Sequence, residues 1–513
     1  MESGIEFSGR PFHFIGIGGI GMSAIAHILA RRKLPISGSD IRLNQITQRL
    51  QEQGAHIFLG HKADNLKFFQ DEVPGSVSQI CSVHLEPTRV GQNEGSASSV
   101  GLSQLPQVIC STAIHADNPE YSAAQAMGCP IYHRSDVLAA LMNCANSIAV
   151  AGTHGKTTTS SMIGYVLLQV GLDPTIIVGG EVEAWGGNAY LGDGDYLVAE
   201  ADESDGSLVK FAAKIGVITN IELDHPDHYQ SLGEVVDIFQ TFSDNCAVVV
   251  GCIDCDNVRQ YLNPAVTYSI HSDSDATYRA DQVYCRGGGT QAQIYEGDRL
   301  LGELWLPVLG QHNLSNALAA IAVARMLGVE FSAIATALKS FKGARRRFES
   351  YGEYHGITFI DDYAHHPSEV QATLSAARLL VESKGQGRKE RGRVVAVFQP
   401  HRYSRAAMFV EEFGLSFDQA DVVLVTEVYG AGEIPDRING QCMAEAIATH
   451  HANVFYRSTL EDVTSLLKQS LRPNDLVMFL GAGNLNRVIP DLVDFYHRSN
   501  VSDLAMVFGQ LVS

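Results

Sequence analysis

Short apolar runs alternate with stretches of helical hydrophobic period in the first part of the chain. Residues 20–32 carry apolar side chains at nearly the helical spacing, and residues 118–127 are also expected to form a helix. The apolar runs expected as strands around these helices are 12–15, 34–39, 108–110 and 130–132. Strands that alternate with helices in this way predict a doubly wound, Rossmann-like α/β domain with a parallel sheet.

The alternation of strands and helices begins again twice further along the chain. A strand at 147–150 leads into a helix that starts near residue 156, and a third pattern follows the basic stretch at 345–349. The strands expected in the third pattern are 394–398, 422–426 and 476–480. We therefore predict three α/β domains, the central one with a mostly parallel sheet and the last one again Rossmann-like. Their expected bounds are 1–146, 147–343 and 344–513.

The stretch from residue 71 to residue 107 interrupts the first domain. It is rich in Ser and Gly and poor in large apolar residues. Such a composition cannot bury enough apolar surface to order itself, so we expect a flexible insertion without an assigned role.

A glycine-rich loop joins the first strand to the first helix. Residues 14–22 read FIGIGGIGM and fit the pattern G-x-G-x-x-G. Glycines there let the backbone turn tightly and approach a phosphate, to which the helix start offers free N–H groups. Asp40 ends the second strand, about where a dinucleotide fold places its ribose-binding carboxylate. The loop predicts a diphosphate site, NAD remains one candidate, and a ligand-free glycine turn is the alternative.

A second phosphate loop opens the central domain. The stretch AGTHGKTTT, residues 151–159, lies between a strand and a helix and ends in G-K-T. In a P-loop the backbone cradles phosphates, so that Lys156 would reach the β- and γ-phosphates and the Thr157 hydroxyl would bind Mg²⁺. Val150 occupies the position of the usual first glycine, and an accidental G-K-T turn is the alternative. The predicted ATP-binding residues of this loop are Gly152, Thr153, His154, Gly155, Lys156, Thr157 and Thr158.

Acidic residues follow two strands of the central domain. A strand at 196–200 ends in Glu200, and another at 215–219 leads toward His225. The further acids of these two clusters are Asp202, Glu203, Asp205, Asp224 and Asp227. Each cluster alone is typical of a solvated loop, but downstream of a P-loop the two together predict oxygen ligands for a magnesium-bound triphosphate. One diphosphate loop and one triphosphate loop favour an enzyme that uses ATP on a nucleotide-linked substrate over a dehydrogenase.

Composition limits the remaining possibilities. The chain has 513 residues, enough for about three domains, and a formal net charge of −20 that argues against a broad nucleic-acid-binding surface. It has neither a signal pattern at its start nor a long apolar run, so we expect a cytoplasmic protein without membrane insertion. The nine cysteines are odd in number and scattered, as in a reduced protein. Cys252 and Cys255 form a lone C-x-x-C without the second pair that a zinc site needs.

Several motifs in a fixed order give the chain a family resemblance. They are GTHGKTTT, EADESD, TNIELDHPDHY, GQHNLSNALAA, RRRFE, DDYAHHPSE and FQPHRYSR. Together they resemble the Mur ligases of bacterial cell-wall synthesis, over nearly the whole chain apart from the insertion. The resemblance implies that ATP, with Mg²⁺, phosphorylates the carboxylate of UDP-N-acetylmuramate, and that the amine of L-alanine attacks the acyl phosphate to form an amide. The first loop would then bind a UDP-sugar instead of NAD.

The resemblance also implies roles for particular residues. The UDP-sugar would contact Gly16, Gly18, Gly19, Ile20, Gly21, Ser39, Asp40, Ser111, Thr112 and Ala113. Lys156, Glu200 and His225 would be catalytic, and Mg²⁺ would be held by Thr157, Glu200 and His225. ATP would also contact His312, Asn313, Asn316, Arg347 and Asp362. The incoming amino acid would be bound by Tyr363, His365, Arg402 and Arg405.

Without the resemblance these residues have plainer interpretations. His312, Asn313 and Asn316 look like a helix N-terminal cap, and His225 looks like a hydrogen-bonded loop histidine. Arg402 and Arg405 would be solvated charges, which share one face if their segment is helical.

Two features separate members of the family. No lysine occurs between Lys214 and Lys339, and Gln240 lies near the position where some members carry a carbamylated lysine. The paired arginines of HRYSR favour a single small amino acid over the tripeptide of a recycling ligase, which remains the main competing interpretation. The sequence also leaves open a regulatory protein without catalysis and an NAD oxidoreductase. We expect a monomer or a homodimer.

Overall fold

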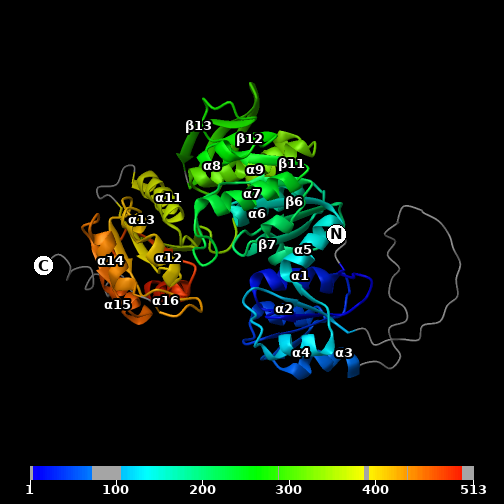
Figure 1. Ribbon diagram of the computed structural model, residues 1–513. Helices are drawn as coiled ribbons and strands as arrows, with labels where there is room; N and C mark the ends of the chain where they lie inside the picture. Colours follow the sequence, from blue (N-terminus) through cyan, green and yellow to red (C-terminus); the bar gives the residue numbers. More distant parts are fainter. Residues whose placement is uncertain (1–3, 72–104, 287, 386–391, 436, 499–513) are drawn as a thin grey trace, which may run out of the picture. The chain divides into compact units, whose positions relative to one another are not determined.

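The computed structural model describes residues 4–71, 105–286, 288–385, 392–435 and 437–498. Most of the predicted insertion, residues 72–104, lies outside the described residues. The chain divides into two compact units (Figure 1). The first unit comprises Met1–Cys144 and Ala189–Leu191, and the second comprises Ala145–Asn188 and Gly192–Ser513.

The first unit contains a five-stranded parallel sheet in the order β3-β2-β1-β4-β5. Its strands are β1 (Phe12–Ile15), β2 (Ile36–Asp40), β3 (His56–Leu59), β4 (Gln107–Cys110) and β5 (Ile131–His133). Its helices are α1 (Ile20–Arg31), α2 (Gln45–Glu52), α3 (Phe68–Asp71), α4 (Pro119–Met127) and α5 (Arg134–Asn143). The order reverses at β1, so the loops after β1 and β4 emerge side by side at the carboxyl edge, where α/β sheets bind ligands.

The second unit holds two sheets, of which the first has ten strands in the order β15-β14-β13-β12-β11-β10-β6-β9-β7-β8. The inner strands are β6 (Asn146–Ala151), β7 (Thr175–Val182), β9 (Tyr196–Glu200), β10 (Ile215–Ile218), β11 (Val248–Cys252) and β12 (Val266–Ser269). The outer strands are β8 (Gly187–Tyr190), β13 (Tyr278–Arg286), β14 (Gly289–Glu296) and β15 (Arg299–Leu306). The sheet is parallel from β7 through β9 and β6 to β13, and β13, β14 and β15 form an antiparallel meander.

Helices pack on this ten-stranded sheet. They are α6 (Lys156–Gln169), α7 (Leu232–Asn245), α8 (Asp256–Tyr261), α9 (Gln311–Met326) and α10 (Phe331–Leu338). Residues of α6, α9 and α10 join the inner strands in one buried core, which fixes α6 directly behind the P-loop. Burial of this core is the main stabilising contribution, because apolar area removed from water yields about 25 cal/mol per Å².

The second sheet of this unit has six strands in the order β16-β17-β21-β18-β19-β20. They are β16 (Glu349–Tyr354), β17 (Ile357–Asp362), β18 (Val394–Phe398), β19 (Val422–Val425), β20 (Val454–Tyr456) and β21 (Leu476–Leu480). All are parallel except β16, which pairs antiparallel with β17. The helices are α11 (Pro367–Gly385), α12 (Tyr403–Met408), α13 (Val410–Gly414), α14 (Gly440–Ala448), α15 (Leu460–Ser470) and α16 (Ile489–Arg498).

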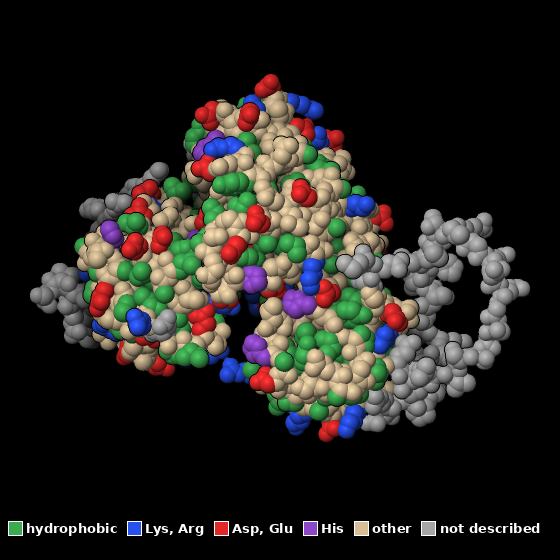
Figure 2. All heavy atoms as spheres, viewed as in Figure 1, with side chains coloured by type: hydrophobic (Ala, Val, Ile, Leu, Met, Phe, Trp, Pro, Cys, Tyr) green, Lys and Arg blue, Asp and Glu red, His purple; other side chains and the backbone are tan. Residues whose placement is uncertain are grey.

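The two faces of the six-stranded sheet carry separate apolar cores. One contains residues of α11, α13 and α14, and the other contains residues of α15 and α16. Helices on both faces make this a doubly wound arrangement, as the sequence predicts. The predicted three-domain α/β layout is therefore confirmed, with one sheet for each pattern of strands and helices. On the face shown in Figure 2, acidic and basic side chains are interspersed.

Among the described residues, no helix is both long enough and apolar enough to cross a membrane.

Candidate functional site

The P-loop is built on β6, the inner strand next to β9 and β10. Val150, where a strict motif has glycine, lies inside β6 and is fully buried beside Glu200 of β9. The turn begins only at Gly152 and ends at Gly155, whose φ is 81°. A Cβ on Gly155 would lie 2.6 Å from Oδ1 of Asn316. Left-handed backbone and this close approach both require glycine there, whereas position 150 needs an apolar strand residue.

Lys156 is the first residue of α6, and its side chain folds back to hydrogen-bond with the backbone of the P-loop. Its Nζ donates to the carbonyl oxygen of Gly152 at 2.8 Å and to Oε2 of Glu203 at 2.8 Å. Burial alone would lower the pKa of Lys156, but the carboxylates of Glu203 and Asp202 outweigh it and raise that pKa. The lysine is therefore a fixed positive charge at the start of the helix, and helix N-termini favour anions such as phosphate.

Two of the three residues predicted to hold Mg²⁺ lie together. The Thr157 hydroxyl donates to Oε2 of Glu200 at 2.8 Å, and the same oxygen accepts the N–H of Gly179 at 2.7 Å. The third, His225, lies with its Nε2 3.6 Å from Asp224 and 3.9 Å from Glu203. Burial lowers the pKa of His225, which favours the neutral imidazole that a metal needs. The hydroxyl and carboxylate oxygens fit the ligand preference of Mg²⁺.

A pocket of about 210 Å³ opens beside the P-loop within the second unit. Eight of the residues predicted to contact ATP line it: His154, Gly155, Thr158, His312, Asn313, Asn316, Arg347 and Asp362. The other lining residues were not predicted from the sequence: Thr219, Asn220, Ser315, Phe348, Ser368, Glu369, Ala372 and Thr373. The pocket thus collects residues from four distant motifs around one loop.

The interpretation of His312, Asn313 and Asn316 as a helix cap is wrong. The N-cap of α9 is Gly310, and no side chain caps it. Asn313 instead donates to the carbonyl oxygen of Leu309 at 2.7 Å, and Asn316 accepts the Thr159 hydroxyl at 3.0 Å. The bond between Asn316 and Thr159 holds the start of α9 against α6.

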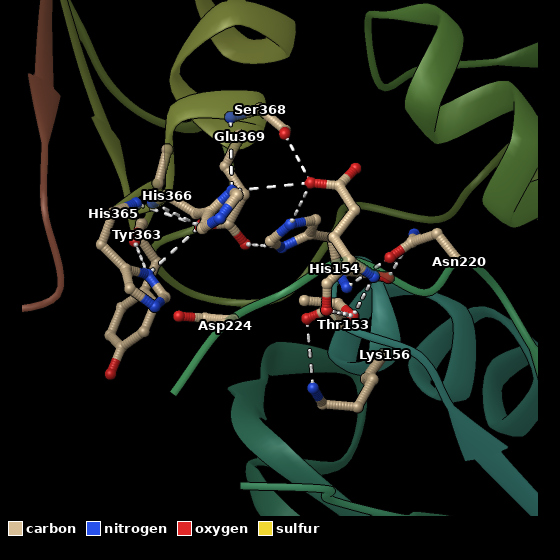
Figure 3. Close-up of polar contacts among 12 residues, drawn as sticks. Thr153, His154, Lys156, Asn220, Asp224, Tyr363, His365, His366, Ser368 and Glu369 are labelled. Atoms are coloured by element: carbon tan, nitrogen blue, oxygen red, sulfur yellow. Dashed lines mark hydrogen bonds and ion pairs between the residues drawn. The ribbon is translucent and has the colours of Figure 1, made fainter. Parts of the chain in front are cut away.

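His154 lies between two carboxylates (Figure 3). Its Nε2 is 3.3 Å from Glu222, and its Nδ1 is 3.3 Å from Glu369. Burial opposes the charged form, but the hydrogen bonds to both carboxylates raise the pKa of His154 to about 10. The ring is therefore an imidazolium that donates from both nitrogens. His154, Glu222 and His366 are also close enough to share a metal ion, but the proton on His154 competes with that use.

Asn220 holds the P-loop through the backbone of His154. Its Oδ1 accepts the backbone N–H of His154 at 2.8 Å, and its Nδ2 donates to the carbonyl oxygen of His154 at 3.0 Å. Asn220 opens the stretch NIELDH two residues after the end of β10, and this place at the carboxyl end of a parallel strand is the sequence signal from which it could have been found.

Arg402 and Arg405 differ in their surroundings. Arg405 is 2% exposed and donates through Nε to Oδ1 of Asp224 at 2.8 Å, so its interpretation as a solvated charge is wrong. Arg402 forms an ion pair with Asp227 and precedes the first residue of α12, with φ of 66°. The idea that the two arginines share a helical face therefore fails, because only Arg405 is helical.

Tyr363 and His365 follow β17. The guanidinium of Arg347 lies 5.1 Å from the ring centre of Tyr363. Burial lowers the pKa of His365 to about 3, so this ring is neutral and its Nδ1 donates to the carbonyl oxygen of Tyr363 at 2.9 Å. Asp362 accepts the N–H of Phe348 at 2.7 Å and thereby ties the segment to the basic stretch before β16.

The glycine loop of the first unit has its own polar anchor. The N–H of Gly18 donates to Oδ2 of Asp40 at 2.9 Å, and Gly16 has φ of 81°. Gly19 caps α1 without a side-chain bond, and Ile20 begins that helix. Asp40 therefore shapes the loop itself, in addition to its predicted place beside the nucleoside.

Ser39 does not present a free hydroxyl. It is fully buried, its Oγ lies 2.8 Å from Nδ1 of His61, and it donates to the carboxylate of Glu120. The remaining predicted UDP-sugar contacts, Gly21, Ser111, Thr112 and Ala113, lie in α1 and in the turn after β4. A Cβ on Gly16 would lie 3.8 Å from Cδ1 of Ile114, so the two loops are neighbours at the sheet edge.

Cys252 and Cys255 are both free thiols. The Sγ of Cys252 lies 3.6 Å from the Ser315 hydroxyl, and the Sγ of Cys255 accepts the N–H of Ile221 at 3.4 Å.

Three α/β sheets, a P-loop and a polar pocket define a multidomain nucleotide-dependent enzyme. Three family models match in order: the Mur ligase family catalytic domain at 11–145, the Mur ligase middle domain at 150–324 and the Mur ligase glutamate ligase domain at 346–483. The chain therefore belongs to the Mur ligase family, and it is a ligase. The family does not support the NAD oxidoreductase considered from the first loop.

Individual relatives are similar over nearly the whole chain. The UDP-N-acetylmuramate–L-alanine ligase of Trichormus variabilis is 57% identical and that of Nostoc punctiforme 58%, each covering 96% of this chain and 98% of the relative. The solved UDP-N-acetylmuramate–alanine ligase of Thermotoga maritima has a TM-score of 0.75 at 28% identity, covering 96% of this chain and 100% of its own. A murein peptide ligase of Psychrobacter arcticus, at 20% identity and a TM-score of 0.64 over 96% of this chain and 100% of its own, shares the fold.

Proposed function

We propose that this chain joins L-alanine to the carboxylate of UDP-N-acetylmuramate, with ATP converted to ADP and phosphate. The product is a precursor of peptidoglycan, so the step serves cell-wall synthesis, cell shape and cell division. The observation that carries the proposal is the 57–58% identity to alanine ligases over 96% of the chain. The tripeptide-recycling alternative has weaker support, because the murein peptide ligase is only 20% identical and shows the fold alone.

The P-loop side of the pocket supplies the charge that phosphoryl transfer needs. ATP would bind with its phosphates over the N-terminus of α6, where Lys156 would stabilise the transferred phosphoryl group. The muramate carboxylate attacks the γ-phosphorus, ADP leaves, and an acyl phosphate forms. His312, Asn313 and Asn316 would contact the adenine from the start of α9, and Arg347 and Asp362 would contact the nucleotide from the other side of the pocket.

Magnesium would be held by Thr157, Glu200 and His225. A bound Mg²⁺ neutralises the phosphate charge that accumulates during transfer. The contact between Thr157 and Glu200 supports the first two assignments, and the neutral ring of His225 supports the third.

The alanine would be bound near Tyr363, His365, Arg402 and Arg405. A guanidinium recognises a carboxylate through two parallel hydrogen bonds, so an arginine is the expected partner of the alanine carboxylate. The alanine amine attacks the acyl carbon, a tetrahedral intermediate forms, phosphate leaves and the amide remains. The UDP portion would be held by the glycine loop and the turn 111–113 of the first unit, with Asp40 supporting the loop.

The test measures ADP release from the full chain with ATP, Mg²⁺ and UDP-N-acetylmuramate. L-Alanine and L-Ala-γ-D-Glu-diaminopimelate are supplied in separate reactions. We expect turnover with L-alanine alone, and Lys156→Ala should abolish it. Because this variant also leaves the buried Glu203 without its counter-charge, the comparison is made below the temperature at which the variant begins to unfold. Turnover with the tripeptide only would assign the chain to recycling, and no turnover with either would contradict a catalytic role.

A further inference from the structure

Glu369 lies in the first turn of α11 and divides its two carboxylate oxygens between different groups. Oε1 lies 3.3 Å from Nδ1 of His154 and 3.8 Å from Nη1 of Arg347. Oε2 accepts the backbone N–H groups of His365 and His366, at 3.0 Å and 3.3 Å. The side chain is only 11% exposed, so the contacts, which are drawn in Figure 3, replace most of its solvation.

The two sets of partners belong to different predicted binding sites. His154 is part of the P-loop, and Arg347 is a predicted ATP contact. His365 is a predicted alanine contact, and its Nδ1 lies 3.2 Å from Oε2 of Glu369. One carboxylate thus connects the nucleotide loop to the backbone that presents the amino-acid site.

A role limited to starting the helix would not explain this arrangement. Accepting the N–H groups of His365 and His366 requires one oxygen, but the other oxygen faces the P-loop. His154 is held in turn by Glu222, whose Oε2 accepts the Ser368 hydroxyl at 2.6 Å. The P-loop and the start of α11 are therefore linked through two carboxylates that share one imidazolium.

We propose that Glu369 is a positioning residue that couples the nucleotide site to the alanine site, by fixing residues 363–366 relative to His154. This inference rests on the proposed function, because it assumes that the two sites bind ATP and an amino acid. A nucleotide that orders the P-loop orders His154, and through Glu369 it orders the segment that contacts the alanine. Each ligand then binds more tightly when the other is present, as reciprocal coupling requires.

The experiment measures the dissociation constant of L-alanine by calorimetry, with UDP-N-acetylmuramate present and with or without a non-hydrolysable ATP analogue. In the unmodified chain we expect the analogue to tighten alanine binding by a factor within roughly 5 to 150, the usual range for coupled sites. Glu369→Gln keeps one oxygen for the backbone N–H groups but loses the charge that holds His154. We expect its coupling factor to fall to within about twofold of unity, a loss in keeping with one charged hydrogen bond.

The matched control is Glu382→Gln, the same substitution at an exposed position of the same helix. It should keep the coupling factor of the unmodified chain. His154→Asn removes the imidazolium partner of Glu369 but keeps the Glu369 carboxylate as the acceptor for the N–H groups at the start of α11. This variant tests the link if Glu369→Gln does not fold. The double variant should lose no more coupling than either single variant, as expected for residues that act through each other.

Three outcomes would overturn the proposal. The first is an unchanged coupling factor in Glu369→Gln and in His154→Asn, and the second is a loss of thermal stability with no change in either binding constant. The third is absence of coupling in the unmodified chain. Because ADP release with L-alanine is measured separately, a failure of the proposed function is distinguished from a failure of the link.

Discussion

The buried ion pair between Arg405 and Asp224 gives the sharpest prediction for stability. Arg405 comes from α12, beside the six-stranded sheet, and Asp224 follows β10 of the ten-stranded sheet. The two residues are 2% and 4% exposed. Burial would raise the pKa of Asp224, but the guanidinium outweighs it and holds that pKa well below its usual range. The perturbations are Asp224→Asn, Arg405→Gln and the two together.

The expected free energies follow from the burial of both charges. Charges roughly 4 Å apart attract by about 4 kcal/mol at an effective dielectric constant of about 20. Desolvation costs several kcal/mol for each ion, so the pair contributes little net stability. Removal of one partner leaves the other buried and uncompensated, which costs about 3–5 kcal/mol. The double variant, with an amide at each position, should recover most of that loss.

Hydrogen exchange of the segments 222–228 and 401–408 is the direct assay, because a chain of several domains need not unfold in one step. A loss of about 3 kcal/mol corresponds to exchange roughly a hundredfold faster in each single variant. Asp227→Asn is the matched control, since its pair with Arg402 is about a third exposed and such pairs contribute about 1 kcal/mol or less. Exchange within about threefold of the unmodified chain in both single variants would refute the reasoning, since the loss would then be below about 1 kcal/mol.

Two further predictions concern the P-loop. The pKa of His154 is raised from 6.5 to about 10, so its ion pairs stabilise the fold fully below pH 6.5 and lose that effect as the pH rises through about 10. Between pH 7 and pH 10 the temperature of thermal unfolding should therefore fall more steeply in the unmodified chain than in His154→Asn. Equal slopes of unfolding temperature against pH would contradict the assignment. Gly155→Ala should weaken ATP binding by about tenfold or more, because left-handed backbone costs about 1–2 kcal/mol for alanine and its Cβ would meet Asn316; unchanged affinity by calorimetry would contradict this.

The strands that the sequence predicts best are buried on both faces. Residues 394–398 and 476–480 are continuous apolar runs, and the structure forms β18 and β21 at those positions. A parallel strand covered by helices on both sides must be apolar throughout, so a local run is sufficient evidence. The antiparallel meander β13 to β15 was not predicted, because its strands mix polar and apolar residues and β13 includes a register shift between Asp281 and Tyr284.

Some residues of the site can be predicted from a local sequence pattern, and others depend on contacts between distant motifs. The P-loop residues follow from one strand, one turn and one helix, all contiguous in the chain. Glu369 and Glu222 gave no such signal, because each becomes significant only when a histidine from another motif lies against it. Nor could the sequence distinguish Arg405 from Arg402, since the burial of one and the exposure of the other depend on which acid of the stretch after β10 each meets.

Two of the ionic links between the sheets of the second unit have opposite polarity. In one, the P-loop side provides the cation His154 and the helix α11 provides the anion Glu369. In the other, α12 provides the cation Arg405 and the loop after β10 provides the anion Asp224. Each side therefore contributes one cation and one anion, and each charge is compensated only when its partner on the other side is in place. The motifs thus form two pairs, GTHGKT with HHPSE and ELDH with HRYSR. The effect of a substitution in one motif depends on the charged partner that it leaves buried without a counter-charge.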